Sequence, residues 1–236
     1  MKMATVKAHP VYDDNRLITR IGVSVVPDPT WPKAILTALA ARPTCEARYT
    51  GQRKAQLSDV ADSVQRRLEA VEELAIQLSQ HLEEANQLAG SLWGIQGRSH
   101  PRTVTRLVIT STSLITELWA SFDNLAQFYV VFLKHIIHKR ISGVRAFEAI
   151  AEFSGDSKTV AVLAGWRDAV LHRGALSPVL WGADGSGSKR SVFGLSVPAS
   201  DKRHVSFGEL TRCRQLLAQA IGALESDLIE RMDREG

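Results

Sequence analysis

The feature that most constrains the fold of this chain is a long apolar stripe with helical spacing. Between Leu57 and Ala89, apolar side chains recur every three or four residues, and charged side chains fill the positions between them. That period matches one face of an α-helix, with the charged residues on the opposite, solvent-facing side. We therefore expect one long amphipathic helix from about Leu57 to Leu88.

A second long helix is expected from about Arg102 to Lys139, after a turn marked by three glycines and Pro101. Its apolar residues form two adjacent stripes, so the apolar surface is broader than one neighbouring helix would cover. A surface of this width predicts a central helix with contacts on more than one side, and part of it could serve a dimer interface.

Shorter elements complete the pattern. Short helices are expected at 31–41 and 143–153, a further helix before Gly174, and a last helix whose Ser206 and Glu209 have the spacing of a capping box. One strand is expected at 16–26. Two more, at 191–197 and 203–207, could pair with each other, and a pairing with the N-terminal strand stays open.

These elements predict an all-α fold, an up-and-down bundle of four to five helices with minor β decoration. We expect residues 1–55 to form an N-terminal extension with a short strand, a short helix and a polar, basic linker at 42–56. Residues 56–236 would form the bundle, interrupted by a loop and β-hairpin insertion at about 175–206.

The composition of the chain narrows the class of protein. A hydrophobic content of 44% and a charged content of 23% are typical of a folded globular chain, and the net charge of +4 permits an anionic partner. The two cysteines, Cys45 and Cys213, have no metal-ligand spacing and fit a reducing compartment. The polar N-terminus and the short apolar run at 125–133 predict a cytoplasmic protein without a signal peptide or membrane span.

The residues that carry chemistry lie between Gly165 and Gly174. Arg167 can hold a phosphate by a two-pronged hydrogen bond, and His172 can exchange a proton near neutral pH. Asp168 and His172 are four residues apart, on one helical face, where the carboxylate can orient the imidazole and raise its pKa. Arg167 and His172 are about 140° apart on a regular helix.

Arg167 and His172 converge only if the helix ends between them, and the sequence offers such an ending. Gly174 stands where a C-terminal cap is expected, and Pro178 follows it. A structural role remains open beside the chemical one. Arginine and histidine in the last turn of a helix also complement the helix dipole, and Trp166 beside them is expected in the core.

The segment Arg167-Asp168-x-x-x-His172-Arg173-Gly174, which ends the third long helical segment, resembles the Arg-polar-x-x-x-His motif of the HEPN superfamily. The name stands for higher eukaryotes and prokaryotes nucleotide-binding domains. As architecture the resemblance covers roughly Leu57 to Met232. It implies a homodimer in which two copies of the motif face each other across a cleft, and many members are metal-independent endoribonucleases of toxin–antitoxin or phage-defence systems.

The resemblance implies RNA as substrate, Arg167 and His172 as catalytic residues, and Asp168 as the residue that orients His172. It implies neither a cofactor nor a metal, and an antitoxin or another protein is an expected partner. Further candidate substrate-binding residues are Arg173, Lys139, Arg140 and, on the second long helix, Asp123.

The sequence leaves two alternatives open. His135 and His138 are three residues apart and could bind a metal, but no third ligand is apparent, and a basic helix end also suits the helix dipole or an RNA-facing rim. The whole chain could also be a non-catalytic HEPN-like dimer that binds RNA, a nucleotide or a protein without turnover.

Overall fold

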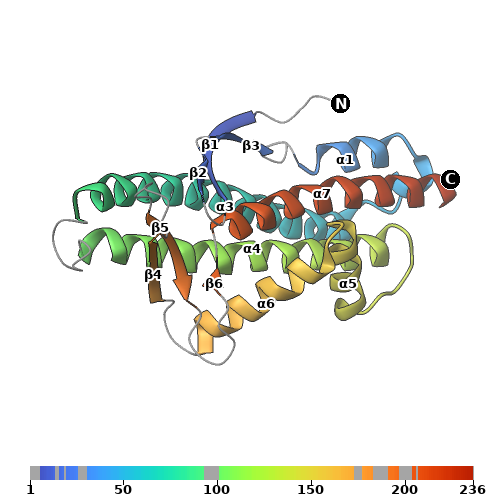
Figure 1. Cartoon of the computed structure of the whole chain (residues 1–236). Helices are drawn as coiled ribbons and strands as arrows, with labels where there is room; N and C mark the ends of the chain where they lie inside the picture. The colour runs from blue at the N-terminus through green and yellow to red at the C-terminus, as the bar shows by residue number, and fades with distance from the viewer. Residues whose placement is uncertain are drawn as a thin grey trace.

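The computed structural model of the chain describes residues 6–13, 16–18, 20–25, 31–92, 101–172, 177–182, 191–196, 204–205 and 207–235. Over these residues the chain is mostly helical, as the sequence predicts (Figure 1). The described part holds seven helices, where four to five were expected, and two small antiparallel sheets of three strands each.

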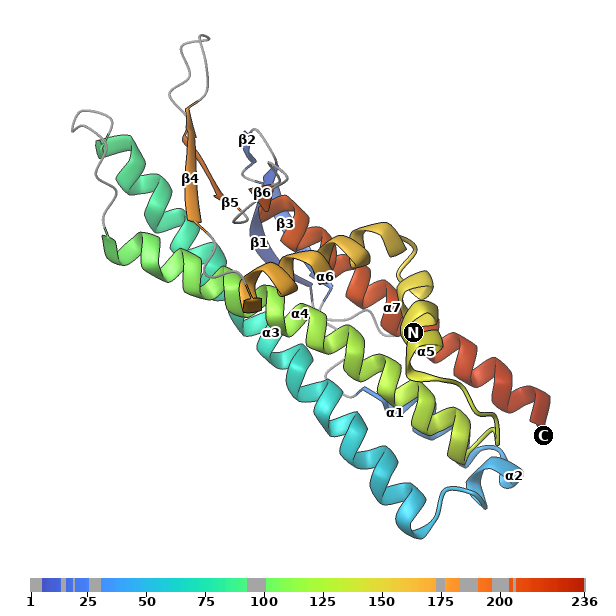
Figure 2. The same cartoon turned by 90° about the horizontal axis from the view of Figure 1, so that it is seen from below.

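Two long helices form an antiparallel hairpin that runs the length of the molecule. They are α3 (Gly51–Leu92) and α4 (Pro101–His135), which lie side by side in both views (Figures 1 and 2). Arg67 of α3 donates to both carboxylate oxygens of Glu117 on α4, at 2.8 and 2.7 Å. The hairpin buries one apolar face from each helix, so the stripes seen in the sequence meet along its seam.

The start of α3 and the end of α4 differ from those predicted from the sequence. The segment 42–56, predicted as a linker, contains the short helix α2 (Pro43–Glu46) and the first turn of α3. Gly51 has a φ of +53°, which favours glycine where the chain turns into α3. Helix α4 stops at His135 because His138 adopts a φ of 56° and the amide of Lys139 donates to the carbonyl of Leu133 at 2.9 Å.

Three further helices cover this hairpin. Helix α5 (Gly143–Phe153) has the bounds predicted for it, and the Ser142 hydroxyl caps it by accepting from the amide of Arg145. Helix α6 (Ser157–His172) crosses α4, and α7 (Phe207–Glu235) lies along the hairpin on another side (Figures 1 and 2). Ser206, the predicted cap of the last helix, lies outside the described residues.

The N-terminal helices belong to the same core as the bundle. Helix α1 (Lys33–Ala40) buries Ile35 and Leu39, and Cys45 of α2 is also fully buried in that core. Ion pairs tie this segment to the end of α7, where Arg42 contacts Asp233 and Arg48 contacts Glu235. The segment from 31 to 50 therefore packs as part of the helical body.

The strands form two separate sheets. In the first, β1 (Val6–Asp13) lies between β2 (Arg16–Ile18) and β3 (Arg20–Val25), so the single strand expected at 16–26 is two strands paired with a third. The second sheet contains β4 (Ser177–Gly182), β5 (Ser191–Ser196) and β6 (His204–Val205), in that order.

The antiparallel pairing of β5 with β6 was predicted and is confirmed, whereas β4 was not predicted. In the described residues the N-terminal strands pair only with one another, so the pairing left open between the two regions is not formed. The second sheet lies beside the α3–α4 hairpin, with β5 next to α3 and β4 next to α4.

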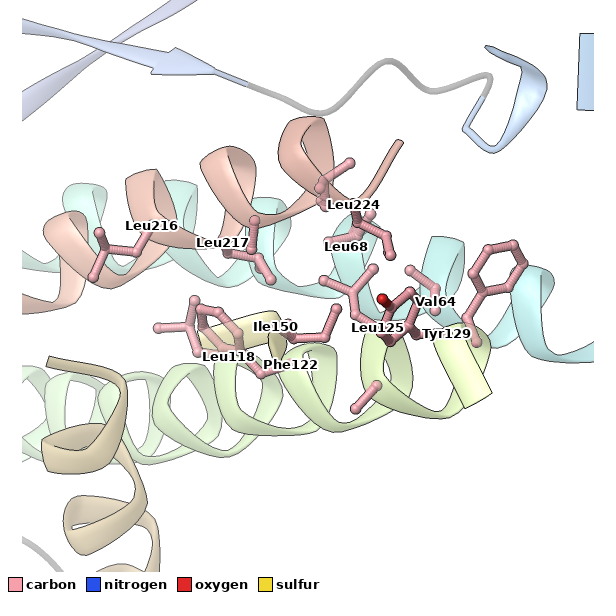
Figure 3. Close-up of a cluster of buried hydrophobic side chains, with 14 of the residues drawn as sticks. Val64, Leu68, Leu118, Phe122, Leu125, Tyr129, Ile150, Leu216, Leu217 and Leu224 are labelled. Atoms are coloured by element: carbon pink, nitrogen blue, oxygen red, sulfur yellow. The ribbon is translucent and has the colours of Figure 1, made fainter. Parts of the chain in front are cut away.

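The core gathers apolar side chains from α3, α4, α5 and α7 (Figure 3). Phe122 and Leu118 of α4 and Ile150 of α5 are fully buried, as is Leu224 of α7. Burying a side chain of this kind contributes about 1.5–3 kcal/mol. Helix α4 contributes to this cluster from several sides, which agrees with its broad apolar pattern and with its central place in the fold.

Candidate active site

Helix α6 carries the candidate active site, and its start is fixed by a side-chain cap. The Asp156 carboxylate accepts from the amide of Thr159 at 3.1 Å and from the Thr159 hydroxyl at 2.8 Å, and Arg212 of α7 also contacts it. These hydrogen bonds, that of the Thr159 amide foremost, hold the pKa of Asp156 below its ordinary value. Asp156 therefore caps the N-terminus of α6.

The buried face of α6 anchors the residues beside the candidate site. Val160, Leu163, Trp166 and Ala169 are all buried, and their steps of three residues place each of them next to the following one on the helix surface. Trp166 is 4% exposed, so its role is packing, as predicted. Because Trp166 immediately precedes Arg167, the backbone that carries the guanidinium is held by the core.

Arg167 and Asp168 form an ion pair on the surface of α6. Arg167 Nη1 donates to Asp168 Oδ1 at 2.9 Å, and the two side chains are 36% and 61% exposed. A guanidinium has five N–H donors, so one bond to Asp168 leaves others for a phosphate. The pair is accessible, and its strength is that of a solvent-screened contact.

Helix α6 ends later than the sequence predicts. The helix continues through His172 and does not end between Arg167 and His172. The two residues are therefore about 140° apart around one helix axis, whereas Asp168 and His172 keep the i, i+4 relation of a shared face. The His172 side chain and all of Arg173 and Gly174 lie outside the described residues.

The other candidate residues are not gathered around Arg167. Lys139 and Arg140 follow α4 at the end of the molecule where α5 begins, while α6 ends against the middle of the hairpin (Figures 1 and 2). Asp123 is exposed on α4, where it accepts from Gln127 of the same helix at 3.0 Å. One protomer therefore does not unite Lys139 or Arg140 with the motif.

Thiols and histidines in the described residues do not assemble a cluster of metal ligands. No group of three or more His, Cys, Asp or Glu side chains that could hold a metal ion occurs in the part of the chain the structure describes. Cys45 and Cys213 are both buried and free. Burial raises the pKa of Cys213 to about 12 and raises that of Cys45 as well, so both thiols are held in the protonated form.

A group of basic and aromatic residues at the start of α3, away from Arg167, was not predicted as functional from the sequence. Arg53 and Lys54 lie in the first turn of α3, and Tyr49 lies just before it. All three fall in the segment that was predicted to be a linker. Its basic composition was the available signal, but the segment was interpreted only as a polar, basic linker.

Comparison of the chain with protein families, with curated proteins and with solved structures finds no match. Among the described residues, no helix has both the length and the apolar character that crossing a membrane requires.

Proposed function

We propose that the chain is a metal-independent endoribonuclease of HEPN type that acts as a homodimeric up-and-down bundle. The observation that carries the proposal is the accessible Arg167 guanidinium, held on α6 by the buried Trp166 and followed at the end of that helix by His172. The resemblance of this segment to the HEPN motif supplies the reaction. It also suggests a cytoplasmic toxin or phage-defence nuclease, with an antitoxin or another protein as partner.

The proposed reaction is attack of a ribose 2′-hydroxyl on the neighbouring phosphorus. A new P–O2′ bond forms and the P–O5′ bond breaks. His172 acts as the base that takes the proton of the 2′-hydroxyl or as the acid that protonates the leaving O5′, and water exchanges the other proton. Arg167 binds the phosphate and stabilises the charge that develops on its oxygens. The products are a cyclic phosphate and a free 5′-hydroxyl, and no metal enters the balance.

The relation of Arg167 to His172 on α6 suggests how the site is assembled. Because the two positions are about 140° apart on one helix, the proposal pairs Arg167 of one protomer with His172 of the partner subunit. Asp168, on the face of His172, orients that imidazole within its own protomer. Two such composite sites would face each other across the dimer cleft.

The first test is cleavage of total cellular RNA in EDTA with end-group analysis. Wild-type protein is expected to leave cyclic phosphate ends, and Arg167→Ala and His172→Ala are expected to be inactive while remaining dimeric. Arg66→Ala is the matched control, because Arg66 is an exposed arginine of α3. Normal cleavage by either motif variant would contradict the assignment.

A mixing experiment tests the composite site directly. In a dimer of one Arg167→Ala and one His172→Ala protomer, one composite site has lost both groups and the other keeps both. Random exchange makes half of the dimers mixed, so the mixture should recover about a quarter of the wild-type activity, as two-fold symmetry requires. No recovery after demonstrated exchange would show that both groups act from the same protomer.

A second candidate function has one observation in its favour. Arg167 already contacts Asp168 and does not share a helix face with His172, an arrangement that also suits a non-catalytic HEPN-like dimer that binds RNA, a nucleotide or a protein. Recovery of intact RNA from a stable complex with the purified wild-type protein would favour this reading over the nuclease.

A further inference from the structure

Basic side chains crowd the end of the molecule opposite the tip of the α3–α4 hairpin. They come from the first turn of α3 and from the end of α4 with the segment after it. We call this surface the basic end, and it consists of Arg53, Lys54, Lys134, His138, Lys139 and Arg140, all of them exposed. Among the described residues, none of its arginines or lysines forms an ion pair.

The favourable interaction of cations with a helix dipole explains only some of these basic residues. Cations at the C-terminal end of α4 are favourable to its dipole, but Arg53 and Lys54 stand in the first turn of α3, where cations are unfavourable and where no acidic residue occurs. Burial, followed by the charges of Lys134, Arg53 and His138, lowers the pKa of His135, so cations from both helices act on one side chain of α4. The basic end is therefore an uncompensated positive surface.

An apolar cavity opens beside the basic end. It has a volume of about 80 Å³ and lies between α1, α3 and α4, with Leu36, Phe128 and Phe132 in its wall. Tyr49 lines it too, and Lys54 Nζ lies 5.7 Å from the centre of the Tyr49 ring. We call this cavity the Tyr49 pocket.

The Tyr49 pocket combines aromatic and apolar walls with a few polar groups. Ser58 and Asp62 of α3 belong to its lining and can hydrogen-bond a ligand edge. Through Lys54 the pocket is continuous with the basic end. An apolar slot with a ring in its wall, bordered by unpaired cations, suits a flat ring attached to a phosphate chain.

We propose that the basic end and the Tyr49 pocket together bind single-stranded nucleic acid, with phosphates on the cations and one unstacked base in the pocket against Tyr49. A single strand can present such a base, whereas a duplex keeps its bases stacked and paired. An anionic membrane or an acidic protein would use the cations but would leave the aromatic pocket without a role. The site is separate from Arg167 and does not require the chain to cleave RNA.

The test is binding of fluorescent oligo(U) and oligo(A), as RNA and as DNA, to the full chain in an Arg167→Ala background, so that cleavage does not interfere. Arg53→Gln/Lys134→Gln removes two phosphate contacts, and the slope of log affinity against log salt should fall by about 1.4, from about 0.7 per contact for a single strand. The matched control is Arg66→Gln/Arg102→Gln, two exposed arginines that lie about 20 Å along α3 and about 50 Å along α4 from the basic end.

The pocket is tested at Tyr49. Tyr49→Leu should weaken binding by at least about 5-fold because it removes a stacking surface, whereas Tyr49→Phe keeps the ring and should bind as the parent does. Equal loss in both variants, an unchanged salt slope, or equal affinity for a duplex or for anionic phosphatidylserine vesicles would overturn the proposal. Because cleavage is not measured, these outcomes are independent of the nuclease assignment.

Discussion

Replacing Asp168 with Asn tests two roles of this carboxylate, its observed ion pair with Arg167 and its proposed hydrogen bond to His172. In the structure Asp168 accepts from Arg167 at 2.9 Å. In the proposed reaction it also orients His172, which is four residues further along the same helical face. The change removes the charge and keeps the shape, so the helix should be unaffected.

The magnitude of the first effect follows from the exposure of the pair. With side chains that are 36% and 61% exposed, this ion pair falls in the class of surface salt bridges, which are worth about 0.2–1 kcal/mol. Releasing Arg167 from it should strengthen phosphate binding by about 1.4- to 5-fold, since about 1.4 kcal/mol is tenfold. This gain applies to the ground state and lowers KM.

The second effect has the opposite consequence for turnover. General acid–base catalysis contributes about 10²- to 10⁴-fold, and a misoriented imidazole forfeits part of it. Asp168→Asn is therefore expected to lower kcat by at least about tenfold while KM falls or stays constant.

Initial rates on a short fluorogenic RNA, in EDTA, separate the two parameters. Asp168→Glu, which restores the charge on a longer side chain, serves as the rescue variant. An unchanged kcat beside a lowered KM would refute the orienting role and leave Asp168 as a partner of Arg167 alone. If neither parameter changed, both contacts would be irrelevant to the reaction.

Three further predictions concern stability. Arg214 donates to both carboxylate oxygens of Glu72, at 2.6 and 2.8 Å, and the two side chains are 12% and 15% exposed. Arg214→Met should therefore lower the free energy of unfolding, measured by urea denaturation, by about 3–5 kcal/mol because it leaves Glu72 without this partner. Glu72→Leu/Arg214→Met should recover part of that loss. Phe122→Ala, in a fully buried site, should cost about 3–5 kcal/mol and lower Tm. Burial, followed by the hydrogen bond to Asp227, raises the pKa of Tyr129 from 10.0 to about 12. Because the folded state holds the phenol proton more tightly than the unfolded state does, the free energy of unfolding should fall by up to about 2.7 kcal/mol between about pH 10 and 12. Tyr129→Phe should abolish this dependence on pH.

The long helices could be predicted because their signal is local. The apolar steps from Leu57 onward require only the helical period, and the same period defines α5 between residues 143 and 153. The start of α3 could not be found this way, because Arg53 and Lys54 are exposed and belong to no apolar stripe. They are helical because the turn at Gly51 and the packing of the following residues extend the helix backward.

The strands and the end of α4 depend on contacts that a local pattern does not contain. Strand β1 is defined by pairing with β2 and β3 on both sides, and β4 by pairing with β5. Helix α4 ends early because His138 adopts a left-handed backbone conformation. The sequence does not predict this conformation, because position 138 is neither glycine nor proline. Pairing and backbone conformation of this kind are set by the tertiary structure.

The candidate residues could be picked out by residue type, but their grouping could not. Arg167 and His172 suggested one compact pair, yet both lie within α6, and Lys139 and Arg140 lie at the basic end with Arg53. Helix α5 begins beside the basic end, whereas α6, which carries Arg167, ends near the middle of the α3–α4 hairpin (Figures 1 and 2), so the two places are apart in the fold.

That separation bears on how the two proposed surfaces could work together. A dinucleotide bound at Arg167 cannot also reach the basic end, so loss of Arg53 and Lys134 should leave cleavage of a dinucleotide unchanged. A longer strand could occupy both surfaces, and its second contact would then be intramolecular, with an effective concentration set by the length of strand between them. The basic end would thus favour long single strands by binding alone, and the chemistry at Arg167 would remain the same for every length of substrate.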